Sequence, residues 1–307
     1  MKKVLVIHYS QSGQLTEIVN TIVDPISESE DIQVVYYQIK MEMPFPFPWK
    51  KKDFLNAFPE SFLQIPSKIE PIPLELLNQE FDLIILGYTV WYLSPSIPVN
   101  SFLSSPEAKE LIADTPIVTV IGCRNMWVMA HEKIKKIFKS CNAKLVGNIV
   151  LVDRHINHIS VITIVQWMLT GKKKRYLGIF PKPGVSQKDI DESSKFGKII
   201  LNHLSNNKLD SLQESLVKAK AVLVSPFLVL TDKRGNVLFK KWANFIYSKG
   251  TVENKKRSLW VTIFGYYLLF AIWIIAPLVF LLFLLTYIPL FNTIKKDKEY
   301  YSSVRIK

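Results

Sequence analysis

Short runs of apolar and β-branched residues recur along the first half of the chain, and stretches with helical spacing separate them. The apolar runs predict strands at Val4–Ile7, Gln33–Ile39, Asp82–Gly87, Ile117–Ile121 and Val146–Val152. The helical stretches lie at Leu15–Pro25, Met129–Ser140 and Gln187–Leu204. Because the strands alternate with helices, the pattern predicts an α/β fold built on a doubly wound, five-stranded parallel sheet.

Two segments interrupt this alternation. Met41–Ile72 contains the run Pro-Phe-Pro-Phe-Pro-Trp from position 44, and alternating prolines exclude a regular helix or strand there because proline lacks an N–H and fixes φ. We expect an extended, aromatic-rich segment, either a lid over a site or a surface excursion that packs its own aromatic rings. The second segment, Ile156–Pro183, joins an apolar stretch to the basic run Lys172–Arg175.

The C-terminal part of the chain is dominated by Leu259–Phe291, a run that contains no charged residue. As one straight helix it would be about 50 Å long at 1.5 Å per residue, longer than the roughly 30 Å hydrocarbon layer of a membrane. A kink at Pro277 would divide it into two legs, each barely long enough to cross. Basic residues flank the run on both sides, which favours the cytoplasmic side. We therefore expect a membrane hairpin or re-entrant segment with both ends cytoplasmic; the alternative is a single tilted span.

These patterns divide the chain into four regions. A sheet domain is expected over residues 1–205, followed by a basic, amphipathic linker over residues 206–257, where Pro226 interrupts the helical spacing. Residues 258–292 form the expected transmembrane or re-entrant segment, and residues 293–307 form a basic tail.

The net charge of +13 would suit nucleic acid, anionic lipid or an anionic substrate. Much of the excess lies beside the apolar run, so we expect membrane lipid as a partner and no nucleic acid. Cys123 and Cys141 form no disulfide framework, and the first residues lead straight into a strand rather than a signal peptide. The expected location is therefore the inner membrane, with the sheet domain facing the reducing cytoplasm. We expect no metal site.

The loop after the first strand has the features of an anion site. It reads Ser10-Gln11-Ser12-Gly13-Gln14-Leu15-Thr16 and joins the carboxyl end of a strand to the amino end of a helix. Unpaired N–H groups and the positive end of the helix dipole favour an anion there. The loop lacks the Gly-Lys-Ser/Thr of a nucleoside triphosphate site and the spaced glycines of a dinucleotide site. By itself it also fits an ordinary turn and helix cap.

Two further loops are expected at the same edge of the sheet. They are Thr89-Val90-Trp91-Tyr92-Leu93-Ser94, after the third strand, and Gly122-Cys123-Arg124-Asn125-Met126-Trp127, after the fourth. In an open parallel sheet, ligands bind beyond the carboxyl ends of the strands where the strand order reverses. One loop would hold a phosphate while the others supply aromatic faces and backbone donors to a flat heterocycle. The alternative for Trp91, Tyr92 and Trp127 is packing in the core.

These loops resemble those of flavodoxins and the related quinone reductases and NAD(P)H:FMN oxidoreductases. The motifs are Ser-x-Ser-Gly-x-x-Thr and Gly-Tyr-Thr-Val-Trp-Tyr-Leu-Ser-Pro, and the resemblance covers roughly residues 1–205. It implies a flavodoxin-like fold whose FMN phosphate is bound by Ser10, Gln11, Ser12, Gly13, Gln14 and Thr16. It further implies that Thr89–Ser94 flanks the isoalloxazine ring and that Gly122–Trp127 lines its other edge. Leu15 departs from the pattern, since short flavodoxins have a small or polar residue there.

A narrower resemblance is to the dialkylresorcinol condensing enzymes of flexirubin and aryl-polyene pigment pathways in Bacteroidetes-type bacteria. It rests on Ile121–Trp127, a helix ending in Leu169–Lys173, and the hydrophobic tail. It implies action beside a partner ketosynthase, although nothing in this chain looks like a ketosynthase nucleophile. The implied reaction is FMN-dependent oxidation of a dialkyl-cyclohexanedione to a dialkylresorcinol, with hydride passing to the flavin and a base removing a proton. Such a hydrophobic substrate would partition into lipid, and the family resemblance also implies a homodimer.

Tyr92, His155 and His158 are the candidate proton acceptors. For each histidine the alternative is a hydrogen-bonded loop residue. Lys172–Arg175 is expected to form a solvated or lipid-facing turn, with contact to the phosphate of NAD(P)H as the alternative. Cys123 is expected to pack at the flavin edge rather than act as a nucleophile. The alternative to an enzyme is a non-catalytic flavodoxin-like electron carrier or membrane recruitment module.

Overall fold

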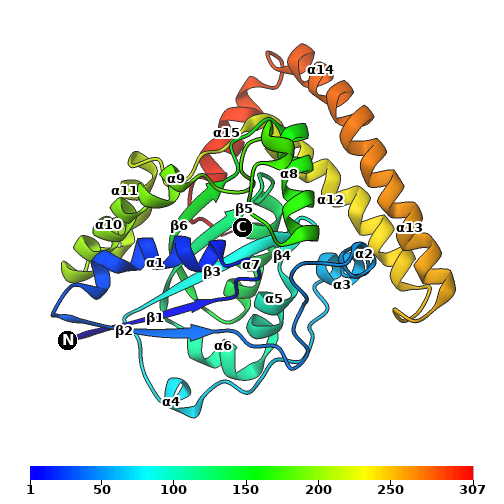
Figure 1. The fold of residues 1–307 in the computed structure, drawn as a ribbon. Helices are drawn as coiled ribbons and strands as arrows, with labels where there is room; N and C mark the ends of the chain where they lie inside the picture. Colours follow the sequence, from blue (N-terminus) through cyan, green and yellow to red (C-terminus); the bar gives the residue numbers. More distant parts are fainter. Residues whose placement is uncertain (307) are drawn as a thin grey trace.

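The computed structural model describes residues 1–306 and contains one open sheet with helices on both faces (Figure 1). Five strands pair in parallel in the order β2-β1-β3-β5-β6. Their bounds are β1 Lys2–His8, β2 Ile32–Gln38, β3 Leu83–Trp91, β5 Pro116–Cys123 and β6 Lys144–Val152. A two-residue strand, β4 (Ser94–Pro95), pairs antiparallel with the end of β3. All five predicted parallel strands are confirmed, and this order, which reverses between β1 and β3, is that of the flavodoxin-like fold.

Alternate residues of the central strands enter two separate cores. In β1, Val4 and Val6 face one core, whereas Leu5 and Ile7 face the other. The first core is covered by α1 (Gln14–Ser27), α9 (Gln187–Asp191), α10 (Ser194–Ser205) and α11 (Leu212–Lys218). The second is covered by α5 (Ile97–Ser104), α6 (Pro106–Ile112) and α7 (Val128–Ser140), with the short α4 (Leu74–Leu77) at its edge. Burial on both faces explains the continuously apolar strands.

The helix predicted at Gln187–Leu204 is two helices, α9 and α10. Ser193 Oγ donates to the carbonyl oxygen of Ile190 at 2.6 Å, a local bond that competes with the helical ladder where the chain turns. Helix α10 then packs closely against α1, and at Gly197 an added side chain would overlap the backbone of Ile22. The break therefore serves the contact between two helices far apart in the sequence.

The proline-rich insert is irregular as far as Trp49, as predicted, but it then continues as two short helices. These are α2 (Lys51–Asn56) and α3 (Phe58–Leu63), so the expectation of a wholly extended segment is wrong. Trp49 N–H donates to the carbonyl oxygen of Met168 at 2.8 Å, on helix α8 (Asn157–Thr170). The alternating prolines end at Pro48, before α2 begins, and Pro59 lies in the first turn of α3, where a helix tolerates proline.

The region expected to be a linker, residues 206–257, packs against the sheet domain instead. Helix α11 buries Leu212 and Leu216 in the first core. Helix α12 (Pro226–Tyr247) begins at Pro226, a position where a helix tolerates proline. Asp232 of α12 accepts a hydrogen bond from Met129 N–H at 3.1 Å. An amphipathic pattern predicts a helix with an apolar face but does not name the surface that covers it.

The apolar run forms one continuous helix from Lys255 to Thr286, so the favoured hairpin is wrong. It comprises α13 (Lys255–Phe270), a π-helical segment at Ala271–Ile275 and α14 (Ala276–Thr286). The π segment ends two residues before Pro277, and this local widening accommodates the proline ring and its missing N–H without ending the helix. The helix is long and apolar enough to cross a membrane, and 6% of its most apolar window is buried.

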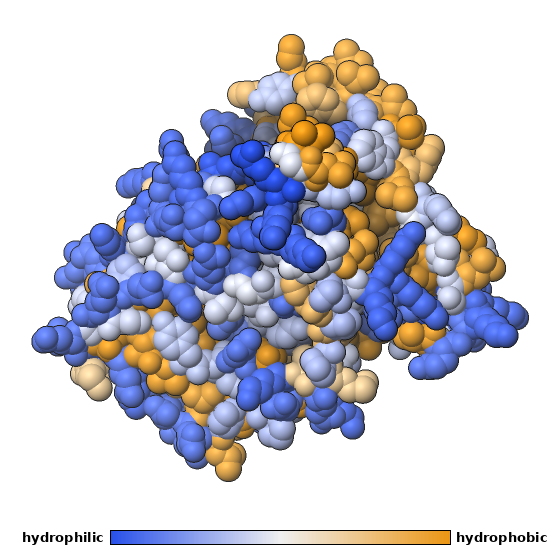
Figure 2. Space-filling view, viewed as in Figure 1, coloured by the Kyte–Doolittle hydropathy of each residue, from blue (hydrophilic) through white to orange (hydrophobic). Residues whose placement is uncertain are grey.

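One side of this long helix lies against the rest of the protein along its length. The less exposed positions recur every three or four residues, at Val261, Phe264, Leu268, Ile272, Ala276, Val279 and Phe283. Helix α12 runs beside it in the opposite direction, because Phe245 meets Trp260 at 4.7 Å and Phe227 meets Phe280 at 4.9 Å between ring centroids. The outer side is apolar and exposed, as the space-filling view shows over α14 (Figure 2).

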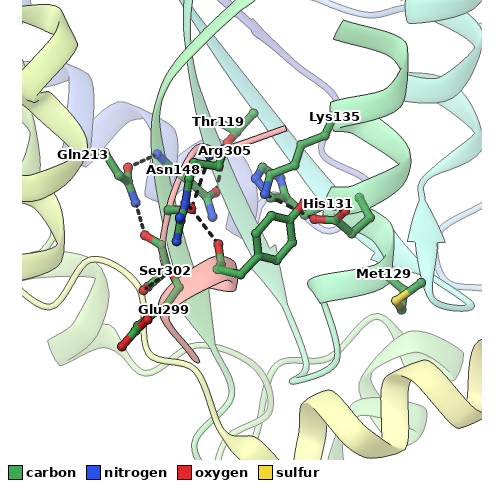
Figure 3. Close-up of polar contacts among 12 residues, drawn as sticks. Thr119, Met129, His131, Lys135, Asn148, Gln213, Glu299, Ser302 and Arg305 are labelled. Carbon is green, nitrogen blue, oxygen red and sulfur yellow. Dashed lines mark hydrogen bonds and ion pairs between the residues drawn. The ribbon is translucent and has the colours of Figure 1, made fainter. Parts of the chain in front are cut away.

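The chain returns from the apolar helix to the sheet through α15 (Phe291–Tyr301). Gln213 Nε2 donates to the carbonyl oxygen of Ser302 at 2.7 Å, and its Oε1 accepts from Asn148 N–H at 2.7 Å (Figure 3). Asn148 Oδ1 in turn accepts from the Thr119 hydroxyl at 2.9 Å. This buried chain of hydrogen bonds fastens the C-terminal segment to β5 and β6, so the helix is held to the domain beyond its end.

Candidate functional site

The three loops predicted from the sequence meet around one cavity of about 250 Å³, at the carboxyl ends of β1, β3 and β5. Their lining residues are Gln11, Ser12 and Gln14, then Thr89, Val90, Trp91 and Tyr92, and then Gly122, Cys123 and Arg124. The cavity lies where the strand order reverses, which is where open α/β sheets bind ligands. The prediction that these three loops meet at one edge of the sheet is confirmed, and ligand binding there stays a prediction.

The other predicted binding residues lie in the same loops without lining the cavity. They are Ser10, Gly13, Thr16, Leu93, Ser94, Asn125 and Trp127. The Thr16 hydroxyl lies 3.1 Å from His8 Nε2, and Ser94 Oγ accepts from Lys133 Nζ at 2.6 Å. Trp127 is buried and packs edge-on against His131. The side chains of Thr16, Ser94 and Trp127 therefore support the loops from the side away from the cavity. For Trp127 this agrees with the alternative that it packs in the core.

Ser10 and Gly13 set the form of the first loop. Gly13 precedes α1 with a φ of 83°, in the left-handed region that favours glycine. Ser10 Oγ is buried and has no hydrogen-bond partner among the described residues. A buried hydroxyl without a partner costs about 1–3 kcal/mol of desolvation. Such a group beside a helix amino terminus fits an anionic ligand that accepts its hydrogen bond.

A double hydrogen bond joins the first loop to a distant segment that sequence reasoning missed. Gln14 Oε1 accepts from Val185 N–H at 3.0 Å, and Gln14 Nε2 donates to the carbonyl oxygen of Val185 at 3.0 Å. The neighbouring Gly184 lines the cavity with a φ of 81°, and a side chain there would overlap Gln14 Oε1. The Pro-Lys-Pro-Gly sequence around it is a turn signal, but it does not indicate which loop the turn meets.

Tyr92 and Leu93 form the turn between β3 and β4, with φ values of 49° and 59°. Two successive positive φ angles are typical of tight hairpin turns and cost roughly 1–2 kcal/mol for each residue other than glycine. Tyr92 OH donates to the carbonyl oxygen of Phe54 at 2.7 Å, and burial raises the pKa of Tyr92 well above 10. The phenol keeps its proton, so the structure does not support Tyr92 as a proton acceptor. It forms part of the cavity wall.

Arg124 is the one charged side chain among the described residues that line the cavity. Its Nη1 donates to Asn157 Oδ1 at 2.7 Å, and Asn125 Nδ2 donates to the same oxygen at 3.0 Å. Burial lowers the pKa of Arg124, but a guanidinium remains charged at any ordinary pH. Burial raises the pKa of the adjacent Cys123 thiol, which stays protonated and unsuited to nucleophilic attack. A fixed positive charge thus lies among apolar walls, where charges interact strongly.

Two further elements complete the cavity. The proline-rich insert contributes Phe47, Trp49, Phe54 and Ala57, and helix α8 contributes Ile164, Trp167 and Met168. The insert therefore forms part of the cavity wall, and we call it the lid; its own rings also pack on one another, Trp49 against Phe45 and Phe54, as the other alternative predicted. Leu15 and Ile18 of α1 also line the cavity, and Gly122 packs against both of them. Leu15, which departs from the flavodoxin pattern, is 2% exposed and belongs to the core.

The structure places neither His155 nor His158 on this cavity, and so does not support them as its proton acceptors. His158 Nε2 lies 3.1 Å from the carbonyl oxygen of Ile272, and its ring packs on Trp273, so it joins α8 to the apolar helix. His155 is exposed and lines a separate pocket of about 430 Å³ with Lys173, Arg175 and Lys182. Val185 also lines this basic pocket, directly after Gly184 of the main cavity.

No protein-family model and no curated protein sequence matches this chain. Solved structures with a similar fold include a flavoprotein in complex with FMN from Lactobacillus acidophilus NCFM, with 19% identity, coverage of 49% of this chain and 93% of that chain, and a TM-score of 0.37. A flavodoxin from the domain Archaea has 14% identity and a TM-score of 0.38, and the match covers 66% of this chain and 99% of that chain. FerB, a flavoenzyme NAD(P)H:(acceptor) oxidoreductase from Paracoccus denitrificans, has 11% identity and a TM-score of 0.31. The match covers 67% of this chain and 98% of that chain. Such distant likenesses leave the function to be inferred from the site itself.

Proposed function

We propose that this protein is a membrane-associated, FMN-dependent oxidoreductase that acts on a hydrophobic ring compound. The observation that carries the proposal is the meeting of three loops around a largely apolar cavity with one guanidinium, at the sheet edge where flavodoxin-like folds bind FMN. The aromatic lid covers this cavity. A cavity with additional aromatic walls suits an enzyme that holds a substrate beside its cofactor, whereas an electron carrier needs an exposed cofactor edge.

The residues of the cavity fit FMN. The phosphate would be held at the start of α1 by the Ser12 hydroxyl, which lines the cavity, by the buried Ser10 hydroxyl and by N–H groups at the helix amino terminus. The flat ring would lie between the loop that contains Trp91 and the loop that contains Gly122, with Cys123 at its edge. When bound, FMN supplies two-electron chemistry by accepting a hydride from an oxidisable substrate.

As substrate we propose a dialkyl-cyclohexanedione that is oxidised to a dialkylresorcinol. A ring of this kind is acidic and would enter as its enolate, whose charge Arg124 would pair. The enolate gives up a hydride and becomes a neutral tautomer of the resorcinol, and a proton shift from carbon to oxygen through water completes the aromatic ring. This route needs no carboxylate or imidazole in the cavity. A ketosynthase that assembles the ring from two acyl chains is the proposed partner.

One anaerobic experiment tests this function. The protein is purified in detergent, its flavin absorbance is recorded with and without added FMN, and a dialkyl-cyclohexanedione is then added. We expect bleaching of the flavin and one equivalent of dialkylresorcinol by mass spectrometry. The matching dialkylcyclohexanone, which lacks the acidic C–H, is the control and should cause no bleaching. Bound flavin without bleaching would favour an electron carrier or recruitment module, and a protein that FMN cannot reconstitute would contradict the flavin assignment.

A second candidate function is the NAD(P)H-dependent reduction of a quinone-like ring. The basic pocket beside the main cavity favours it, because Lys173, Arg175 and Lys182 suit the phosphate groups of a nicotinamide cofactor. Anaerobic bleaching of the flavin by NADPH or NADH tests this alternative. Bleaching that Arg175→Gln slows would favour the reductase, and no bleaching by either nucleotide would exclude it.

We infer that the apolar helix anchors the protein by lying along the cytoplasmic surface of the membrane. At its start, Arg257 is 1% exposed and donates to Glu60 Oε2 at 2.7 Å. Towards its end, Phe283 is buried against α12. A perpendicular crossing would remove both residues from the domain that covers them. Along the surface, the exposed side enters lipid while the basic residues near both ends meet anionic headgroups.

Labelling from one side of the membrane tests this orientation. Single cysteines replace the exposed Thr251, which precedes the helix, and the exposed Asn292, which follows it, in a variant that carries Cys123→Ala and Cys141→Ala. A membrane-impermeant maleimide is added to inverted inner-membrane vesicles and, separately, to intact spheroplasts. We expect both cysteines to react only in the inverted vesicles. Reaction of the two from opposite sides would establish a membrane crossing and contradict the inference.

A further inference from the structure

A second apolar cavity, of about 690 Å³, lies between α2, α8 and the apolar helix. We refer to it as the chain groove. Its apolar walls include Leu55, Val161, Val165, Val261, Leu269 and Ile272. The volume lies within the roughly 300–1,000 Å³ range of small-molecule sites. The few polar groups on its walls, such as Ser258 and Thr262, leave little to hydrogen-bond a polar ligand.

The chain groove adjoins the proposed flavin cavity. Phe54 of the lid and Met168 of α8 line both cavities. They are the shared wall, and both side chains are apolar. Methionine adapts readily to the shape of a neighbouring ligand because its chain is unbranched and flexible. A chain attached to a ring in the first cavity would therefore pass these two side chains into the groove without meeting a buried charge.

At its other side the chain groove is bounded by the surface that the proposed orientation turns toward lipid. Tyr266 is 66% exposed, Leu269 is 49% exposed and Val165 is 42% exposed, and all three line the groove. Lys51 and Lys52 stand at its rim on α2, where they suit anionic headgroups. An amphiphile dissolved in the membrane would thus meet the groove before it reached water.

We propose that the chain groove binds a long, unbranched alkyl chain of the ring-bearing substrate, and that the substrate enters the flavin cavity from the lipid along this path. The proposal rests on the proposed function and names its substrate class as an amphiphile with a small polar ring and an alkyl chain. Each methylene buried in the groove should improve binding about fourfold, since burying one contributes about 0.8 kcal/mol. The protein should therefore select its substrates by chain length.

Reoxidation of the flavin by quinones measures this selection. The FMN-loaded protein is reduced with dithionite and mixed with a benzoquinone that has no tail, or with the same quinone carrying a decyl tail. We expect the decyl compound to react faster by at least about tenfold, and Val165→Trp to reduce this rate ratio about tenfold because the indole fills the groove. Leu259→Trp adds the same ring to an exposed position of α13 outside the groove and should preserve the ratio. Equal rates for the two quinones, or equal effects of the two substitutions, would overturn the proposal.

A second measurement needs no flavin. A decyl benzoquinone with a terminal diazirine is photolysed with the purified protein in lipid nanodiscs, and a diazirine-labelled phosphatidylcholine is used in parallel. Both probes reach lipid-facing residues, so the readout is the labelling of peptides 161–169 and 261–272 relative to 278–288. We expect this ratio to be several-fold higher for the quinone than for the phospholipid. If the phospholipid labels the groove peptides as strongly as the quinone does, the groove holds membrane lipid and the proposal fails. If the quinone labels the groove peptides in a protein that binds no FMN, the chain groove is supported as a binding site. That result would contradict only the proposed flavin-dependent function.

Discussion

Trp49 Nε1 donates a hydrogen bond of 2.9 Å to Gln11 Oε1, and this bond joins the lid to the loop that begins α1. Gln11 Nε2 in turn donates to the carbonyl oxygen of Pro46 at 2.8 Å. The Trp49 ring also packs edge-on against Trp91, with ring centroids 5.6 Å apart. The loop expected to hold a phosphate therefore also fixes the lid, and binding at one should be coupled to the position of the other.

Trp49→Phe tests this coupling because it removes the indole N–H and keeps an aromatic ring in the lid. A hydrogen bond contributes about 0.5–1.5 kcal/mol, so we expect FMN to bind roughly two- to tenfold more weakly. Quenching of flavin fluorescence on titration of the apoprotein measures the change. Trp260→Phe is the control, since this half-buried ring packs against Phe245 and does not line the cavity. An unchanged affinity for Trp49→Phe would mean that the lid does not act on the flavin site.

Ser10→Ala separates binding from stability. Ser10 Oγ is buried and has no partner among the described residues, so its removal should leave the melting temperature unchanged or raise it slightly. The same truncation should weaken FMN binding about tenfold if the hydroxyl donates to the phosphate. Ser96→Ala removes another buried hydroxyl without a described partner, at the N-cap of α5 instead of in the loop before α1, and should not affect FMN. Equal FMN affinities for the two variants would exclude Ser10 from the phosphate site.

Gly184→Ala should destabilise the protein through a clash as well as through backbone strain. The added methyl would overlap Gln14 Oε1 and disturb the pair of hydrogen bonds between Gln14 and Val185. Gly178→Ala is the matched control, since its φ of 71° is also positive but the space around it is open. We expect Gly184→Ala to lower the free energy of unfolding by about 1–3 kcal/mol more than the control does. Urea unfolding measures the free energy of unfolding of both variants. Equal losses would mean that backbone strain alone, and no clash with Gln14, destabilises Gly184→Ala.

Arg124→Gln should retain FMN and lose the proposed dione oxidation. The cavity would keep its shape but lack its one positive charge among the described lining residues. A hydrogen bond to a charged group contributes about 1.5–3 kcal/mol, so we expect kcat/KM for the dione to fall roughly 10- to 150-fold. Arg124→Lys keeps the charge and should restore part of the activity. A dione rate that Arg124→Gln leaves unchanged would contradict pairing between the guanidinium and the enolate.

Asp232 should make stability depend on pH near neutrality. The side chain is fully buried, and burial raises its pKa from 3.8 to about 7. The folded state therefore binds this proton more tightly than the unfolded chain, so the stability gained from protonation is complete below about pH 4 and is lost as the pH rises to 7. Asp232→Asn, which has no charge to bury, should be more stable than the natural protein at pH 8 by on the order of a few kcal/mol.

Thermal unfolding between pH 4 and pH 8 measures this effect. The difference in melting temperature between Asp232→Asn and the natural protein should become smaller as the pH falls. Asp210→Asn changes an exposed carboxylate and is the control, for which no such trend is expected. A constant difference at all pH values would mean that Asp232 does not exchange its proton in this range.

Several features of the site were predictable because they depend on local pattern and on the geometry of parallel sheets. The run Leu83–Leu86 is apolar throughout, a pattern typical of a strand covered on both faces. Once three parallel strands were assigned, their following loops had to meet at one edge, which brought Ser12, Trp91 and Arg124 to one cavity.

The sequence by itself determined the strands, the cavity edge and the presence of a long apolar helix, since each depends on the spacing of residues near one another in the chain. Only the tertiary structure decided that the insert closes over the cavity, that α11 and α12 pack on the domain, and that His158 bonds the apolar helix. It also decided that Phe264 and Phe283 lie on one covered side of that helix. These outcomes depend on contacts between surfaces that are far apart in the sequence. An apolar helix face predicts that the face is buried, but it does not indicate which surface covers it.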